Sequence, residues 1–190
     1  MTDHQAISQE VIDQFVGAAH GDLVTVQLLL AQYPELVHAN ASWNELAVEA
    51  AAQTGRADIV ELLLEAGAPL DICTAAMLGD IHLVERFLDV DPQSALASGA
   101  HGIPLLYFAV IRSNLEVVVM LLSRGAMVNA GASGNTPLHG AVMFRQDRMV
   151  SWLLANGADA SLKDYNGRTP LELALENNDP EIANLLKQVD

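Results

Sequence analysis

Apolar residues along most of the chain recur at three- and four-residue intervals, the spacing that places them on one face of a helix. The clearest runs are LVTVQLLL, ADIVELLL, IHLVERFL, LEVVVMLL, RMVSWLL and PEIANLL. Each run follows a turn that is marked by Gly21, Gly55, Gly79, Ser113, Arg145 or Asn178. A second apolar stretch precedes each turn. The pattern therefore predicts an all-α protein made of about six helix-turn-helix units.

Two short phrases repeat in phase with these units. Residues 134–141 read GNTPLHGA and residues 167–174 read GRTPLELA. Thr136 and Thr169 are predicted to cap the first helix of their units, a contact worth ~1 kcal/mol, and the following proline suits the first helical position. The second helix of a unit is predicted to end at a glycine, where a left-handed backbone is favoured; these glycines are Gly67, Gly125 and Gly157.

The Thr-Pro-Leu-His phrase, the Leu-Leu pair and the Gly-Ala pair, kept in register over residues 131–160, resemble the ankyrin repeat. The resemblance implies a solenoid of helix pairs joined by short hairpin loops, with the terminal repeats acting as caps. The segment TDHQAISQEVIDQ, from residue 2, supplies the polar face that such a cap needs. We predict one domain over residues 1–190, with repeats at about 8–40, 41–69, 70–98, 99–130, 131–163 and 164–190.

The copies are unequal. Pro104 takes the place of the capping threonine in the fourth copy, and the short linker APLDICT indicates that no hairpin projects between the second and third copies. Pro34 and Pro92 break the chain after the second helix of copies one and three. These prolines are 58 residues apart, as are several glycine, alanine and leucine pairs. Either a two-repeat block was duplicated or single repeats drifted independently.

Charge is distributed unevenly along the chain, whose net charge is −15. Residues 1–98 contain 15 acidic side chains against two arginines, whereas residues 99–190 contain nine acidic and seven basic side chains. Such a balance argues against nucleic-acid and membrane partners. It serves solubility alone or steers a partner with a basic surface. The single cysteine, Cys73, and the lack of a long apolar run favour a soluble, monomeric, cytoplasmic protein.

Catalytic and cofactor motifs are missing from the sequence. The six histidines and Cys73 have no metal-ligand spacing, and no phosphate-binding loop or nucleophile elbow occurs. Cys73 is predicted to lie on a buried helix face. The resemblance implies that His139 has a structural role, bonding to backbone between layers. We therefore expect neither enzymatic activity nor a cofactor.

The resemblance implies instead a protein-binding module, acting as an adaptor or stoichiometric inhibitor, whose partner lies in the concave groove. Family members use their hairpin tips and the exposed ends of their first helices. The corresponding positions here are Trp43, Glu45, His101, Ile103, Tyr107, Ile111, Arg112, Asn135, Met143, Phe144, Arg145, Tyr165 and Arg168. The alternatives are an immunity-type or regulatory subunit that masks a basic partner, and an enzyme-associated subunit.

Large apolar residues at four of these positions, Trp43, Ile111, Met143 and Phe144, are expected to face water, as interface hot spots do. The other possibility is that some of them pack beneath a loop. Successive arginines are expected to line one side of the groove, with acidic residues of the second copy at the other end; these are Arg112, Arg145 and Arg168, against Glu45 and Glu49.

Overall fold

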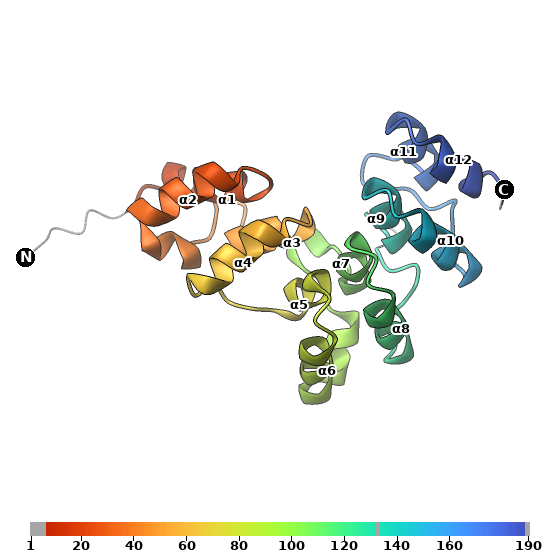
Figure 1. The fold of residues 1–190 in the computed structure, drawn as a ribbon, viewed down its shortest axis with the longest axis horizontal. Coiled ribbons are helices and arrows are strands. Elements are labelled where there is room, and N and C mark those ends of the chain that lie inside the picture. Colours follow the sequence, from red (N-terminus) through yellow and green to blue (C-terminus); the bar gives the residue numbers. More distant parts are fainter. Residues whose placement is uncertain (1–6, 132–133, 189–190) are drawn as a thin grey trace, which may run out of the picture. The chain divides into compact units, whose positions relative to one another are not determined.

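A computed structural model describes residues 7–131 and 134–188 of the chain. Within these two stretches the regular structure is helical, with α-helices, short 3-10 helices and two isolated β-bridges but no strand. The chain divides into two compact units, Met1–Leu70 and Asp71–Asp190 (Figure 1). The all-helical class predicted from apolar spacing is confirmed. Residues 2–6 of the predicted N-terminal cap lie outside the described residues.

The first unit contains two helix pairs separated by a 3-10 turn. Its elements are α1 (Gln9–Ala19), α2 (Leu23–Gln32), η1 (Pro34–His38), α3 (Ala47–Gln53) and α4 (Ala57–Glu65). The first helices α1 and α3 pack against each other, and so do the second helices α2 and α4. The buried faces meet in an apolar core that includes Phe15, Val26, Leu36, Ile59 and Leu63.

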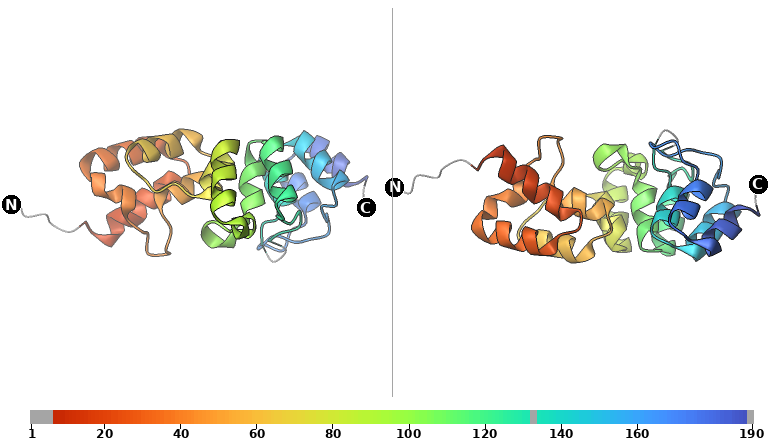
Figure 2. Two further views of the ribbon diagram at one scale, coloured as in Figure 1. Left: turned by 90° about the horizontal axis from the view of Figure 1, so that it is seen from below. Right: turned by 90° about the horizontal axis from the view of Figure 1, so that it is seen from above.

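The second unit contains four helix pairs of the same kind. Its elements are α5 (Ile72–Leu78), α6 (Ile81–Val90), η2 (Pro92–Leu96), η3 (Ala100–Gly102), α7 (Leu105–Ile111), α8 (Leu115–Ser123), α9 (Pro137–Met143), α10 (Asp147–Ala155), α11 (Pro170–Glu176) and α12 (Pro180–Leu186). The first helices of the pairs, α5, α7, α9 and α11, pack side by side in chain order (Figure 2). No helix in the described part of the chain is long and apolar enough to span a bilayer.

Helix starts follow the capping chemistry expected of their residues. The Thr136 hydroxyl accepts from the backbone N–H of His139, and Thr169 forms a reciprocal capping box with Glu172. At the equivalent position of α7, Pro104 has no side-chain cap. The predicted threonine caps and the missing cap at Pro104 are therefore confirmed.

The turn inside each pair has a common backbone conformation. Five of the six predicted marks have a positive φ, between 52° and 78°: Gly55, Gly79, Ser113, Arg145 and Asn178. A residue with a side chain costs roughly 1–2 kcal/mol in this left-handed region. Ser113, Arg145 and Asn178 therefore carry backbone strain that Gly55 and Gly79 avoid. Because this conformation recurs at the predicted turn residues, it supports the register in which the helix-turn-helix units were assigned.

The 58-residue period has a structural counterpart. The 3-10 helices η1 and η2 begin at Pro34 and Pro92, and the two bridges, Asn40 with Leu46 and Ser98 with Pro104, are also offset by 58 residues. Between α4 and α5 the chain needs only residues 66–71, whereas residues 124–136 join α8 to α9. The expected lack of a projecting hairpin after Gly67 agrees with this short connection.

Candidate functional site

The ends of the first helices in the second unit bring one residue from each layer into a row. Each first helix of this unit is followed by a turn residue with a positive φ. The residue immediately before that turn residue is Leu78, Arg112, Phe144 or Asn177. Because α5, α7, α9 and α11 pack in order, these four side chains come from successive layers of one surface. We call them the helix-end row.

Phe144 is the aromatic member of this row and is only partly buried. Its ring meets the buried Tyr107 ring edge to face, with centroids 6.4 Å apart, and Tyr107 meets Phe108 in the same way at 6.0 Å. The Tyr107 hydroxyl donates to the sulfur of Met143 over 3.5 Å. A side chain on Gly140 would come within 2.7 Å of the Tyr107 ring, so this glycine makes room for the stack.

Burial fixes the chemistry of the tyrosine under Phe144. It raises the pKa of Tyr107 far above the usual value, with a further increase from Tyr165. The phenol therefore stays protonated, and its ring acts as a neutral support for Phe144. The pair holds a partly accessible aromatic ring in place before any partner arrives, which lowers the ordering cost of binding.

Two arginines flank Phe144 without an acidic partner among the described residues. Arg112 is exposed and lies in the helix-end row. Arg145 is exposed, has a φ of 55°, and donates from Nη2 to the carbonyl of Asn177 over 2.7 Å. The positive charge of both guanidinium groups thus remains available at the surface.

Arg168, the third arginine expected in the groove, forms intramolecular ion pairs. It lies 2.7 Å from Asp164 and 2.8 Å from Glu176. The Asp164 carboxylate is fully buried; burial raises its pKa, but hydrogen bonds, chiefly from the Arg168 side chain, outweigh burial and lower it. Hydrogen bonds that Arg168 donates to Asp164 and then to Glu176 raise the pKa of Arg168. This arginine pins the hairpin to the end of α11.

Several predicted binding residues lie inside the protein. Tyr107 and Ile111 are 2% and 3% exposed, so the expectation that Ile111 faces water is wrong. The residue before the helix-end row is buried in the first two layers of the second unit, at Met77 and Ile111, whereas the row residues Leu78 and Arg112 are more accessible. Asn135 is also buried, and its Oδ1 has no hydrogen-bond partner among the described residues.

Glu45 is completely buried in the first unit, where an exposed acid was expected. Its carboxylate accepts hydrogen bonds from the indole of Trp43 at 2.6 Å and from the Gln53 amide at 2.7 Å. The same amide donates to Nε2 of His20 over 2.8 Å, and that ring lies 3.8 Å from Glu45. Trp43, which donates to this cluster, is itself 43% exposed.

The remaining predicted positions are at hairpin turns. Tyr165 is strongly exposed, at 68%, on the turn before α11. His101 is exposed on η3 with a positive φ, and Ile103, which follows η3, is half-buried. Met143 is half-buried at the end of α9, beside Tyr107. An exposed aromatic side chain is thus present on the last hairpin, at Tyr165, and a partly accessible apolar one at the end of α9, at Met143.

Sequence reasoning missed a depression beside the turns that join α7 to α8 and α9 to α10. It has a volume of about 600 Å³ and is lined by Ser113, Leu115, Gln146, Asp147, Arg148, Met149 and Trp152. Ser113 bonds to the side chain of Gln146, which also donates to the carbonyl of Ile111 at 3.0 Å. A signal for it was present in RMVSWLL, where Trp152 falls outside the buried positions of the helix.

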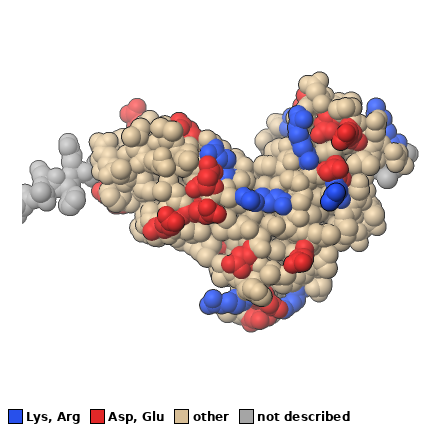
Figure 3. Space-filling model, viewed as in Figure 1, with Lys and Arg blue, Asp and Glu red and all other residues tan. Residues whose placement is uncertain are grey.

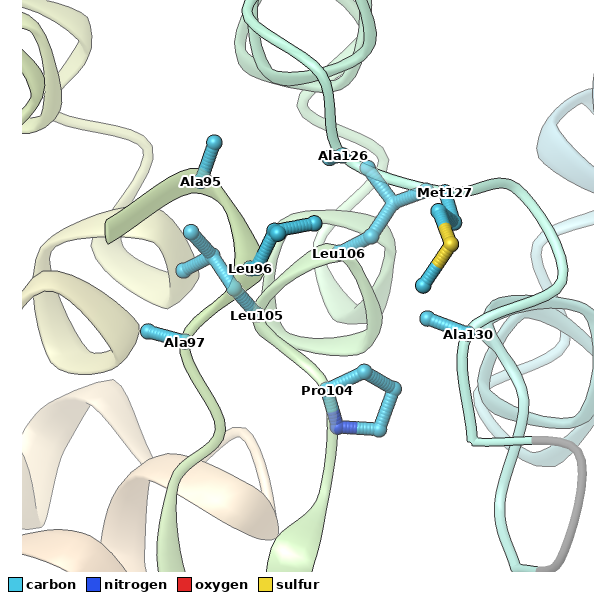
Figure 4. Close-up of a pocket in the computed structure, with 9 residues that line it drawn as sticks. All are labelled: Ala95, Leu96, Ala97, Pro104, Leu105, Leu106, Ala126, Met127 and Ala130. Atoms are coloured by element: carbon cyan, nitrogen blue, oxygen red, sulfur yellow. The ribbon is translucent and has the colours of Figure 1, made fainter. Parts of the chain in front are cut away.

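A smaller gap lies between η2 and the turn after α8 (Figure 4). Its volume is about 30 Å³, and the lining is apolar apart from backbone: Ala95, Leu96, Ala97, Pro104, Leu105, Leu106, Ala126, Met127 and Ala130. The gap is a packing feature and is too small for a ligand.

His139 and Cys73 have the structural positions that were predicted for them. His139 is buried; its Nε2 donates to the carbonyl of Arg168 over 3.0 Å, and its Nδ1 accepts from the Thr136 hydroxyl over 2.8 Å. Burial lowers the pKa of His139, so the ring is neutral. Cys73 is buried within α5. In the described residues, no three histidine, cysteine or acidic side chains gather closely enough to hold a metal ion.

Comparison with known proteins agrees with the helix pairs and turns. A model of three ankyrin repeats matches residues 72–164, and a model of a single ankyrin repeat matches residues 47–75. This protein belongs to the ankyrin-repeat family. The resemblance read from the Thr-Pro-Leu-His phrase is thus confirmed. Ankyrin repeats generally mediate contacts between proteins and are typically non-catalytic modules.

Similar proteins are diverse and much longer than this chain. Ankyrin repeat and SAM domain-containing protein 6 of Rattus norvegicus is 32% identical over 63% of the chain, and the nuclear factor NF-kappa-B p105 subunit of Gallus gallus is 28% identical over 82%. The aligned parts make up 14% and 17% of those proteins. A putative ankyrin repeat-containing protein of Treponema pallidum is 33% identical over 65% of the chain and 43% of its own length.

Proposed function

We propose that this ankyrin-repeat protein is a non-catalytic adaptor or stoichiometric inhibitor whose partner protein binds the helix-end row of the second unit. The binding surface consists of Arg112, Phe144 and Arg145, extended by Met143 and by Tyr165 on the last hairpin. We further propose that it acts as a monomer in the cytoplasm, in keeping with its single, buried cysteine.

The observation that carries this proposal is a supported aromatic ring, Phe144, in the same region as two exposed arginines: Arg112 in the neighbouring layer of the helix-end row and Arg145 next in sequence. Phe144 rests on the buried Tyr107, and neither Arg112 nor Arg145 has an ion pair among the described residues. Aromatic and arginine side chains dominate the binding energy of protein interfaces when they are clustered and rigid. The three side chains combine these properties on one surface.

The side chains of the helix-end row also favour one chemical type of partner segment, an acidic one with an apolar anchor. Two guanidinium groups beside an apolar ring fit a segment that presents carboxylates around an apolar anchor. Arg168 contributes little to this selectivity, because Asp164 and Glu176 already neutralise it. The buried Glu45 likewise leaves the first-helix side of the first unit less acidic than the sequence predicted.

Affinity capture from an extract of the source cell tests the proposal. The wild type is compared with Arg112→Glu/Phe144→Ala and with a control, Arg86→Glu/Val90→Ala, which makes the same kinds of change on the outer side of α6, where both residues are exposed. We expect the control to retain the same partner as the wild type and the first variant to lose it. Equal capture by all three proteins would refute this placement.

A further inference from the structure

The second helix of the first pair has an unusual outer face. Val24 and Leu28 of α2 are 64% and 66% exposed, and Ala31 is exposed one turn later. Residues at i, i+4 and i+7 lie on the same side of a helix. No residue of α2 is charged. An uninterrupted apolar stripe therefore faces outward along the whole helix.

The equivalent helix of the next block shows that the fold does not require this stripe. At an offset of 58 residues, α6 has His82, Arg86 and Asp89 in place of Val24, Leu28 and Ala31. The inward position is the same in both helices, since Val26 and Val84 are each fully buried. The two helices thus keep one core face and differ on the outer face.

An acidic row borders the apolar stripe. The neighbouring helix α4, which packs against α2, exposes Asp58, Glu61 and Glu65. Asp58 is paired with Arg56 at 2.6 Å, whereas Glu61 and Glu65 make no ion pair in the described part of the chain. Figure 3 shows the acidic atoms gathered over α4 and an uncharged expanse over α2.

We propose that α2 and α4 form a second docking surface, which binds an amphipathic helix of a partner protein with Lys or Arg residues beside its apolar stripe. The ten residues of α2 extend over roughly 15 Å, which matches about three turns of a bound helix. The apolar stripe of the partner covers Val24 and Leu28, and its basic residues lie over Glu61 and Glu65. This surface is independent of the helix-end row.

Charge distinguishes this occupant from the two other candidates. A second copy of the chain would bring another acidic row against α4, and like charges repel across an interface. An anionic membrane would meet a protein with a net charge of −15. Only a basic partner both covers the stripe and pairs with the unpaired carboxylates.

Three synthetic peptides of about five helical turns each, long enough to overlap α2, provide the probe. The first has a leucine stripe flanked by lysines, the second has the same stripe flanked by glutamates, and the third keeps the lysines but has glutamines in place of the leucines. Binding to the 190-residue protein is measured by fluorescence anisotropy at low and high salt. We expect the first peptide to bind at least about tenfold more tightly than either control, and to weaken in salt.

Variants of the protein locate the binding. Val24→Ser/Leu28→Gln leaves the charge unchanged and should weaken the first peptide by about tenfold, because two apolar contacts are lost. Glu61→Gln/Glu65→Gln should weaken it by roughly threefold and reduce its salt dependence. Val119→Arg on the outer face of α8 and Arg112→Glu/Phe144→Ala should leave it unchanged. Thermal unfolding verifies that each variant is folded.

Four results would overturn the proposal. These are no binding of the first peptide, equal binding of the glutamate-flanked peptide, unchanged binding to Val24→Ser/Leu28→Gln, and a wild-type dimer in analytical ultracentrifugation that this variant abolishes. The Arg112→Glu/Phe144→Ala variant tests the helix-end row and not the surface formed by α2 and α4. Failure of this proposal and failure of the proposed function therefore appear in different variants.

Discussion

The segments α1–α4 and α5–α8 share the order of their α-helices and of the 3-10 helix that begins at a proline, although η3 occurs only in the second, and they have different side chains at matching positions. Both contain a helix pair, a 3-10 helix that begins at a proline, an isolated bridge and a second pair. Glu45 and Gln53, which hydrogen-bond at 2.7 Å in the first segment, correspond to Ile103 and Ile111 in the second. The fold thus fixes where side chains meet, while their chemistry changes.

The outer helices differ in the same manner. In the first segment α2 is apolar and α4 acidic; in the second, α6 is charged, while α8 exposes Leu115 and Val119. The inward-facing position of α2 and α6 is the same, since Val26 and Val84 are both buried. On these outer helices the outward-facing residues vary while the inward-facing residue is kept, so we expect binding differences to depend on the outward-facing residues.

Breaking the polar pair Glu45 and Gln53 by replacing Gln53 alone should have the largest effect on stability. Gln53→Ile removes a hydrogen bond to the buried Glu45 carboxylate and should lower the free energy of unfolding by about 2 kcal/mol. Glu45→Ile/Gln53→Ile, which copies the pair Ile103 and Ile111, should cost less than half as much. Urea denaturation of both variants and of Glu45→Ile completes the cycle; strictly additive losses would contradict the coupling.

The glycines at the first turn of each segment should respond differently to the same substitution. Gly79 has a φ of 78°, and an added Cβ would lie 2.5 Å from Nδ2 of Asn114. At Gly21 the nearest atom would be 3.5 Å away, and φ is not positive. We expect Gly79→Ala to cost about 1–2 kcal/mol and Gly21→Ala to cost less than about 0.5 kcal/mol, both measured by chemical unfolding. Equal costs would show that the two turns are equivalent after all.

The second turns of the two segments offer the smallest contrast. Gly55 and Ser113 are matching residues with φ values of 69° and 56°. Gly55→Ser should destabilise the protein by about 1 kcal/mol, since a Cβ is disfavoured there. Ser113→Gly should stabilise it by less than that, because the bond from Ser113 to Gln146 is lost as well. Opposite signs in thermal unfolding are the expected outcome, and equal signs would be inconsistent with strain at Ser113.

Local chemistry in the sequence predicted the architecture well, because capping and turn residues act over a few positions. Thr136 and Thr169 mark helix starts without knowledge of the rest of the fold. Side-chain direction at the helix ends could not be predicted equally well. Ile111 and Arg112 are adjacent in sequence, but one packs into the next layer and the other faces solvent.

Contacts between distant residues account for the other differences. Glu45 is buried because Trp43, Gln53 and His20 surround it, and the last of these is 33 residues from Gln53 in the chain. Arg168 is occupied by Asp164 and Glu176, which a count of arginines does not reveal. The apolar outer face of α2, in contrast, has a signal in the sequence, because the run LVTVQLLL contains no charged residue.

The placement of the partner on the second unit is tested most directly by hydrogen–deuterium exchange of the wild type with and without the captured protein. We predict slower exchange in residues 105–112 and 137–145, which carry Arg112, Phe144 and Arg145, and no change in α6. Unchanged exchange in both stretches, with protection elsewhere in the second unit, would contradict the assignment.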